Sequence, residues 1–430
     1  MQLYQHQKEI VDQDPKRCGL WLGTGSGKTR TALAMAQGKV LVICPKTQRD
    51  DQNWQREAGK MNLDVDLTVI SKEEFRRDHQ KMISEKDFYD TVIVDEAHTV
   101  LGVTPNTHQK NRKKRPRASQ LFYALKEYIE ACDPERLYLV TATIVKSPIT
   151  VWGAGVILGK LTFGLESFYK FRDIYYIRLP MPREVYAPNS ARSVKERLAK
   201  FVNKLGFVGR LEDYFDVPEQ TYKDEYIEMT TEQKEAIKDV RLDFPDPIVA
   251  IGKRHQVEQG ILAGDQFNKP QQFKENKTAR IIEYTYEFPR MIVFARYTQQ
   301  ILNLEKALKK IGKKVYVMNG ATKNRGELLA EINNANDYVF IVQSKISAGW
   351  ELPHCPVMIF LSREHSFVDY DQAQGRILRS NHLKKNLYIN LMVRGHEKSK
   401  KGRVLSIDEA VHKSLLNKQD FSEKVYAESN

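Results

Sequence analysis

Cysteine is scarce in this 430-residue sequence, and long apolar runs are absent. The four cysteines, Cys18, Cys44, Cys132 and Cys355, are far apart and form no CxxC pair, so neither a disulfide framework nor a zinc site is indicated. Cys44 stands in an apolar run and is interpreted as a core residue. No stretch approaches the ~20 apolar residues of a membrane helix, and the first residues have no signal-peptide pattern. We therefore expect no membrane contact and a reducing, cytoplasmic location.

Charge of one sign is in excess. Lysine and arginine total 68 against 55 acidic residues, which gives a formal net charge of +13. Such an excess favours a polyanionic partner, and the alternative is a soluble protein that is merely basic. Hydrophobic residues make up 41% of the sequence, which is enough for packed cores. The length predicts two to three domains.

Short apolar runs alternate with segments of helical period. Strand candidates lie at 40–44, 91–94, 137–140, 291–294, 314–318, 338–342, 357–361 and 386–391, separated by helical patterns such as 29–36, 119–131, 298–311 and 325–333. This alternation predicts an α/β protein whose parallel sheets are covered by helices on both faces. We expect domains at 1–164 and 276–430, the second closing with a helix over 406–418. A mainly helical connecting and accessory segment is expected at 165–275.

A glycine-rich turn separates an apolar run from a helical pattern at residues 20–31, LWLGTGSGKTRT. Its backbone N–H groups and the positive end of the following helix are suited to phosphate oxygens. Lys28 would reach the outer phosphates of a nucleotide, and the Thr29 hydroxyl would ligate Mg²⁺. The full pattern has a glycine at position 22, where this chain has Leu22. The candidate phosphate-binding residues are Gly23, Thr24, Gly25, Ser26, Gly27, Lys28 and Thr29.

A carboxylate pair follows the apolar run at 91–94, in the tetrapeptide DEAH at 95–98. Asp95, at the end of the predicted strand, would hold Mg²⁺ partly through water. Glu96 would orient or deprotonate the attacking water. A polar strand end is the alternative for an isolated DEAH, but its place about 65 residues after a phosphate loop favours catalysis.

With these two motifs the sequence resembles the superfamily 2 helicases, which implies two RecA-like domains and the cofactors ATP and Mg²⁺. Residues 3–7, LYQHQ, resemble the adenine-sensing motif of that superfamily, which would make Gln7 the residue that reads the base. The start of an amphipathic helix is an alternative for this segment. Thr141-Ala142-Thr143 resembles the motif that couples hydrolysis to nucleic acid. By resemblance Thr141, Thr143 and Lys46 would act at the nucleic acid.

The second half carries Gln372 to Arg379, QAQGRILR, which matches the superfamily pattern QxxGRxxR. The resemblance makes Arg379 an arginine finger and Arg376 a second γ-phosphate contact, because developing phosphate charge needs a forked cation. A basic helix is the alternative. Residues 347–352 resemble the preceding motif, so Gly349, Glu351 and Gln372 join the candidate ATP-site residues. ATP would complete its site only when the two domains close on it.

Three segments resemble the Swi/Snf-like branch: 43–46 with NWQRE at 53–57, 217–219 with 229–233, and IDE at 407–409 with Lys418. Two features depart from it, since Ile144 stands where that branch has proline and the arginine motif reads GRILR. The resemblance implies a compact phage or bacterial translocase without large accessory insertions. We expect a monomer in the cytoplasm of a bacterium or a phage-infected cell.

Residues 110–117, KNRKKRPR, hold six basic residues in eight within the first domain. We interpret the segment as a loop that grips DNA phosphates, which salt would weaken. A solvated loop and a nuclear signal are the alternatives. The candidate DNA contacts here are Lys110, Arg112, Lys113, Lys114, Arg115 and Arg117.

The sequence thus predicts a DNA-dependent ATPase that moves on duplex, forked or branched DNA and remodels or unwinds it. An RNA helicase is one alternative, against which Trp54, Glu57 and the closing helix speak. A clamp that uses ATP only as a switch is another, against which Glu96 speaks. A motor subunit of a restriction or packaging assembly is a third.

Overall fold

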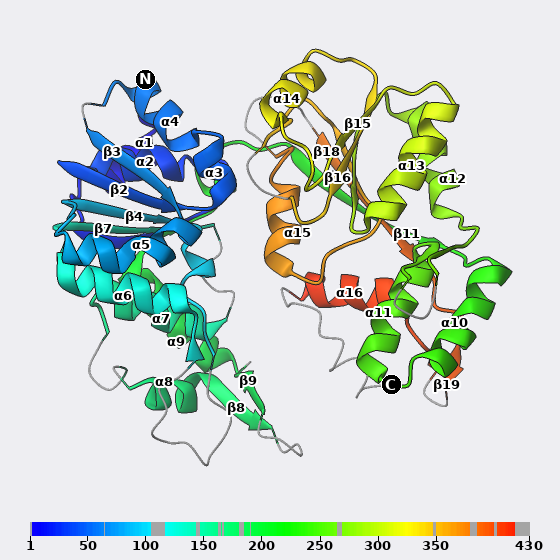
Figure 1. Ribbon diagram of the computed structural model, residues 1–430, viewed down its shortest axis with the longest axis horizontal. Helices are drawn as coiled ribbons and strands as arrows, with labels where there is room; N and C mark the ends of the chain where they lie inside the picture. Colours follow the sequence, from blue (N-terminus) through cyan, green and yellow to red (C-terminus); the bar gives the residue numbers. More distant parts are fainter. Residues whose placement is uncertain are drawn as a thin grey trace. The chain divides into compact units, whose positions relative to one another are not determined.

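The computed structural model describes residues 2–63, 65–104, 117–142, 147–161, 165, 167–179, 185–189, 191–264, 269–346, 350–378, 385–399 and 402–417. The chain divides into two compact units, Met1–Phe215 and Asp216–Asn430 (Figure 1). No helix in the described ranges is long and apolar enough to cross a membrane.

Unit 1 is built on a parallel sheet with the strand order β10-β1-β7-β4-β2-β3. These strands are β1 (Arg17–Leu22), β2 (Lys39–Cys44), β3 (Asp66–Ser71), β4 (Thr91–Asp95), β7 (Arg136–Val140) and β10 (Gly206–Gly209). Two antiparallel pairs are added, β5 (Val103–Thr104) with β6 (Arg117–Ala118) and β8 (Tyr176–Leu179) with β9 (Val185–Pro188).

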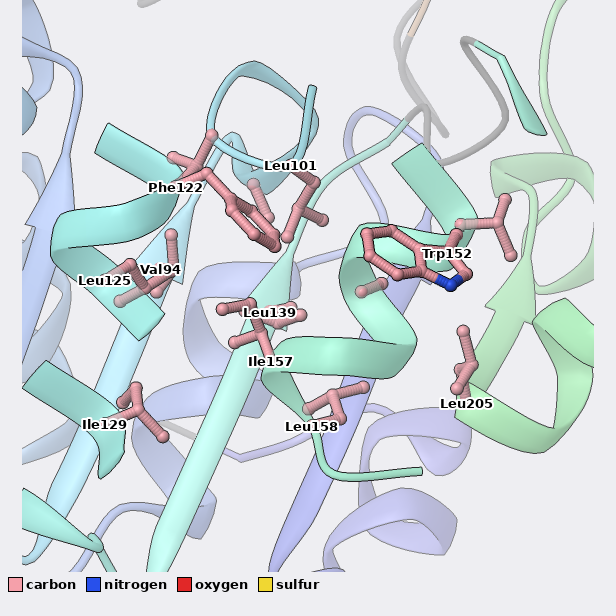
Figure 2. Close-up of a cluster of buried hydrophobic side chains, with 14 of the residues drawn as sticks. Val94, Leu101, Phe122, Leu125, Ile129, Leu139, Trp152, Ile157, Leu158 and Leu205 are labelled. Carbon is pink, nitrogen blue, oxygen red and sulfur yellow. The ribbon is translucent and has the colours of Figure 1, made fainter. Parts of the chain in front are cut away.

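The helices of unit 1 cover both faces of its sheet. They are α1 (Gln5–Val11), α2 (Lys28–Met35), α3 (Lys46–Asp50), α4 (Asn53–Met61), α5 (Lys72–Ser84), α6 (Gln120–Cys132), α7 (Pro148–Ile157), α8 (Phe168–Tyr175) and α9 (Arg192–Leu205), with short 3₁₀ turns η1 (Ala97–Thr99) and η3 (Leu211–Asp213). Neighbouring strand residues point to opposite faces. Leu41 therefore packs with α5, α6, α7 and α9, whereas Val42 packs with α1, α2 and α4. Figure 2 shows part of the first core, where Val94 and Leu139 of the sheet meet Phe122 and Leu125 of α6.

Unit 2 has a parallel sheet in the order β11-β18-β17-β14-β16-β15. Its strands are β11 (Glu219–Ile227), β14 (Arg290–Ala295), β15 (Val315–Met318), β16 (Tyr338–Gln343), β17 (Val357–Phe360) and β18 (Lys385–Val393), with the short strands β12 (Ile261–Leu262), β13 (Gln271–Gln272), β19 (Lys398–Ser399) and β20 (Gly402–Arg403). Its helices are α10 (Thr231–Asp243), α11 (Pro247–Glu258), α12 (Lys277–Glu287), α13 (Thr298–Lys310), α14 (Arg325–Asn333), α15 (Phe367–Gln374) and α16 (Ile407–Leu416).

Both faces of this second sheet are also covered. Helices α12 and α13 pack on the face that carries Val293 and Ile341. Helices α14, α15 and α16 pack on the face of Phe294 and Val342. The predicted fold class, two α/β units with parallel sheets covered on both sides, is confirmed.

The structure divides the predicted connecting segment 165–275 between the two units. Helices α8 and α9 with β10 belong to unit 1, because β10 pairs with β1. Strand β11 and helices α10 and α11 belong to unit 2, because β11 pairs with β18 along its whole length. Strand pairing between segments distant in sequence thus sets the division, at residues 215 and 216.

Candidate active site

The glycine-rich turn joins β1 to α2 in unit 1, at the carboxyl end of a parallel strand, where sheets of this kind bind ligands. Gly25 and Gly27 have φ of 85° and 82°, a left-handed conformation that glycine adopts readily. The Lys28 Nζ donates to the carbonyl oxygen of Gly23 over 3.0 Å, and the hydroxyl of buried Ser26 donates to the same oxygen over 2.7 Å. The loop is therefore folded back on itself, with the lysine at its centre.

Gln7 lies in α1 against this loop and is fully buried. Its Nε2 donates to the carbonyl oxygen of Gly27 over 3.1 Å, and its Oε1 accepts from the backbone N–H of Tyr4 over 2.9 Å. The adjacent ring nitrogen Nε2 of His6 lies 2.9 Å from the carbonyl oxygen of Ser26. The residue predicted to read adenine thus supports the phosphate loop, and its contact with a base stays a prediction.

The carboxylate pair ends β4, two strands away from β1 in the sheet. Asp95 accepts hydrogen bonds from the indole Nε1 of Trp54 over 3.3 Å and from the backbone N–H of Glu96 over 2.9 Å. Glu96 has φ 45° and ψ 51°, a left-handed backbone that costs a non-glycine residue about 1–2 kcal/mol. Such strain is held by the surrounding contacts and is frequent at active sites.

The side chain of Glu96 meets two further residues of unit 1. Its Oε2 lies 3.3 Å from Nδ1 of His98 and accepts a long hydrogen bond, 3.5 Å, from the hydroxyl of Thr141. The same His98 nitrogen lies 2.8 Å from the Thr141 hydroxyl oxygen. Thr141, predicted to couple hydrolysis to nucleic acid, is therefore in direct contact with the predicted catalytic carboxylate.

The two carboxyl groups differ in proton affinity. Burial raises the pKa of Asp95, and the neighbouring Glu96 charge raises it further. Burial opposes ionisation of Glu96 too, but the hydrogen bond and charge of His98, with the ammonium groups of Lys28 and Lys72, outweigh burial and lower its pKa. Without a metal ion, Glu96 therefore holds its negative charge more firmly than Asp95. A base at Glu96 needs this ionised form.

Several contacts at this site were absent from the predicted site residues. Trp54 and Glu57 served only as markers of a family branch, yet they lie three residues apart on α4 and so share one face. Trp54 binds Asp95, and Glu57 forms a 2.8 Å ion pair with Arg30 of α2. Lys72, whose ammonium group donates to the carbonyl oxygen of Glu96, was not predicted at all. A lysine at the first position of a helix was the available signal, because the helix dipole disfavours it there.

In unit 2 the structure brings together Arg376, Gln372 and the segment around Glu351. Arg376 is buried, and its guanidinium donates to the carbonyl oxygens of Gln372 over 3.0 Å and of Trp350 over 3.1 Å. The backbone N–H of Leu352 donates to the carbonyl oxygen of Arg376 over 3.0 Å. The predicted arginine motif is thus bonded to the segment that precedes it in the sequence.

The remaining predicted residues divide into two groups. Lys46 is exposed at the start of α3, and the backbone of Arg117 lies in β6. Outside the described residues lie Thr143, Gly349, Arg379, Lys110, Arg112, Lys113, Lys114 and Arg115.

The part of the chain that the structure describes contains no group of three or more His, Cys, Asp or Glu side chains placed to hold a metal ion. A Thr29 hydroxyl and an Asp95 carboxylate fit Mg²⁺, which usually keeps several waters and takes one or two carboxylates with substrate phosphates.

Comparison with known families bears on unit 2. Residues 274–381 match the family described as helicase conserved C-terminal domain. The match supports the predicted resemblance to helicases over this part of unit 2. The helicase match runs from just before α12 to just after Arg379, so it includes the predicted arginine motif.

Among solved structures, the chain is similar to the Sulfolobus solfataricus SWI2/SNF2 ATPase core in complex with dsDNA. The identity is 16% and the TM-score 0.39, over 100% of this chain and 92% of that one. No curated protein matches the sequence.

Proposed function

We propose that this protein is a Mg²⁺-dependent ATPase of superfamily 2 that couples ATP hydrolysis to movement on duplex, forked or branched DNA. One observation carries the proposal. A glycine-rich loop at the carboxyl end of β1 and the Asp95–Glu96 pair at the carboxyl end of β4 belong to the same parallel sheet. The helicase match over residues 274–381 supports the same class of motor from the other unit.

In this proposal the loop N–H groups and the N-terminus of α2 bind the ATP phosphates, and Lys28 exchanges its bond to Gly23 for a bond to the outer phosphates. Thr29 and Asp95, with water, would hold Mg²⁺, which would supply positive charge to the phosphates. Glu96 orients the attacking water and accepts its proton. Its ionised state, favoured by His98 and Lys28, supports this assignment.

Residues of unit 2 and the adenine contact complete the proposal. Arg376 and Arg379 would stabilise charge on the γ-phosphate, with Gln372 as a further residue of the ATP site and with Gly349 and Glu351 coupling hydrolysis to DNA. Gln7 would read adenine from its place against the phosphate loop. The hydrogen bonds of Arg376 to the carbonyl oxygens of Gln372 and Trp350 link the arginine motif to the segment around Glu351, which supports a shared role for the two segments.

The choice of DNA over RNA rests on the Swi/Snf-like segments, because the net charge of +13 favours a polyanionic partner of either kind. The NWQRE segment contacts Asp95 through Trp54, and it contacts helix α2, which follows the glycine-rich loop, through the Glu57–Arg30 ion pair. Because these residues contact the candidate catalytic site, we use their resemblance to the Swi/Snf-like branch as an argument about function.

The test is ATP turnover measured without nucleic acid and with single-stranded, duplex, forked and four-way DNA, and RNA. We expect DNA to raise the rate, and forked or four-way DNA to raise it most. A rate raised by RNA and not by DNA would favour the RNA helicase. An ATP turnover rate in wild type no higher than that of Glu96→Gln would reject the ATPase and favour the clamp that uses ATP only as a switch.

A further inference from the structure

Lys72 occupies a position that ordinary local rules assign to other residues. It is the first residue of α5, where the helix dipole disfavours a cation, and its side chain is 8% exposed. A buried lysine is rare unless it is paired. Local rules are most often broken at functional sites, so the contacts of this ammonium group matter.

The ammonium group reaches the DEAH turn from the end of β3, two strands away from β4 in the sheet. Its Nζ donates to the carbonyl oxygen of Glu96 over 2.9 Å and to the hydroxyl oxygen of Thr99 over 2.6 Å. Ser71 caps α5: its hydroxyl accepts from the backbone N–H of Glu74, and its own backbone N–H donates to the Glu74 carboxylate. This capping box fixes the helix start that carries Lys72. The lysine therefore reaches the turn from a rigid base.

The carbonyl oxygen of Glu96 has three donors. Besides Lys72, it accepts from the hydroxyl of Thr99 over 2.9 Å and from the Thr99 backbone N–H over 3.1 Å. Glu96 has a left-handed backbone at this point, with φ of 45°. Because that conformation is disfavoured for glutamate, the bonds on its carbonyl oxygen hold the turn and, through it, the direction of the carboxylate.

The charge of Lys72 acts on the same group. Its ammonium raises the tendency of both Asp95 and Glu96 to ionise, against the effect of burial. In return, burial lowers the pKa of Lys72, while the two carboxylates raise it. The ammonium group of Lys72 is thus a cation held in place beside the two carboxylates.

We propose that Lys72 is a positioning residue for the catalytic carboxylate: it fixes the carbonyl oxygen of Glu96 and so aims the Glu96 side chain at the water that attacks ATP. This rests on the proposed ATPase. The hydrogen bonds of Lys72 go to Glu96 and Thr99 and not to the phosphate loop or Thr29, so we assign its role to the hydrolytic step and not to nucleotide binding.

The test compares Lys72→Met with Lys81→Met, a control on the same helix whose lysine is exposed. We expect Lys72→Met to lower kcat by about 10- to 100-fold with KM for ATP within about twofold, the split expected when an interaction is used only in the transition state. Lys81→Met should leave both constants unchanged. Equal kcat in Lys72→Met and wild type would overturn the proposal.

Thr99 offers a second, milder variant pair. Thr99→Val removes the hydroxyl that bonds both Lys72 and the Glu96 carbonyl, whereas Thr99→Ser keeps it. We expect Val to lower kcat and Ser to restore most of it. The double variant Lys72→Met/Thr99→Val should be little slower than Lys72→Met, because both changes break one cluster. Fully additive effects would contradict a shared cluster.

Hydrogen exchange separates this inference from the proposed function. The backbone N–H groups of Thr99, Val100 and Leu101 bond to Glu96 and Ala97 in this turn. We expect their exchange to be at least about tenfold faster in Lys72→Met and unchanged in Lys81→Met. If wild type fails to hydrolyse ATP, the proposed function fails, and unchanged exchange in Lys72→Met would still reject the positioning role.

Discussion

The indole Nε1 of Trp54 donates a hydrogen bond to Oδ2 of Asp95 across 3.3 Å. Trp54 is 1% exposed, so this bond is shielded from water. Partners of this kind orient metal-binding carboxylates, and their loss typically costs 10- to 100-fold in metal affinity or activity.

Trp54→Phe keeps the apolar packing and removes the donor. We expect the Mg²⁺ concentration for half-maximal ATPase to rise by about tenfold. Trp152→Phe, which also loses one indole hydrogen bond, is the control, because Trp152 bonds the carbonyl oxygen of Leu165 in another part of unit 1. An unchanged Mg²⁺ dependence in Trp54→Phe would separate Trp54 from the metal site.

Gly27→Ala tests the phosphate loop. A Cβ at Gly27 would meet Nε2 of Gln7 at 2.1 Å, and the φ of 82° is strained for alanine. We expect binding of a fluorescent ATP analogue to fall by more than about tenfold in a protein that remains folded. Gly59→Ala is the control, since nothing lies within 4 Å of a Cβ there and the site is in helix α4. That change should instead stabilise the protein by about 0.5–1 kcal/mol.

Thr141→Val and Thr141→Ser distinguish two roles for one residue. If Thr141 acts on Glu96, Val lowers the basal rate without nucleic acid by about tenfold and Ser restores it, because only the hydroxyl bonds His98 and Glu96. If Thr141 acts at the nucleic acid alone, the basal rate is unchanged and only the stimulation by DNA falls. We expect the first result, from initial rates with and without DNA.

Asp408 and Lys277 form a buried pair in unit 2, with Nζ 2.5 Å from Oδ2. Burial opposes ionisation of Asp408, but the charge of Lys277, with the hydrogen bond and charge of His255, outweighs burial and holds the pKa of Asp408 well below its usual range. A depressed carboxyl pKa contributes stability above the unfolded pKa, about 3.9, that is lost as the pH falls below it. We expect the free energy of unfolding from urea titrations to fall steeply below about pH 4.

Variants of this pair give the matched test. Asp408→Asn leaves Lys277 buried without its counter-charge and should cost about 3–5 kcal/mol at pH 7. The double variant Lys277→Met/Asp408→Asn should cost less than Asp408→Asn alone and should lack the acid-dependent loss. A double variant as unstable as the sum of the single ones would argue against a coupled pair.

Residues 110–117 carry the prediction of a DNA grip. Replacing Lys113, Lys114 and Arg115 with serine should weaken binding to duplex DNA and reduce the slope of log affinity against log salt by up to about three, while the basal ATPase stays the same. Fluorescence anisotropy at several salt concentrations measures both. An unchanged slope would identify a solvated loop.

The inner strands of both sheets were predicted from the sequence because they are continuous apolar runs. The strand predicted at 40–44 is Lys39–Cys44 in the structure, and the helix predicted at 325–333 is Arg325–Asn333. Strands β3, β10 and β11 were missed. All three lie at or beside a sheet edge, and β11 in particular has mostly exposed residues, EQTYKDEYI. An edge strand buries less surface, so its sequence carries little of the apolar signal.

The sequence likewise predicts some residues of the candidate site and not others. Lys28, Thr29, Asp95 and Glu96 stand in short motifs whose spacing reflects their chemistry, so the sequence alone predicts them. The contacts of Lys72 with Glu96 and Thr99 span 24 and 27 residues, and that of Trp54 with Asp95 spans 41. Such pairings depend on the order of strands in the sheet, which local patterns do not encode.

Helix α4 joins the two halves of the site through Trp54 and Glu57. Arg30, Glu57, Trp54 and Asp95 are therefore linked through one helix. Loss of the tryptophan or of the acid in one lineage would relax selection on its partner. Among related sequences, Arg30 should vary together with Glu57, and a lineage without the tryptophan should carry another donor that reaches the aspartate.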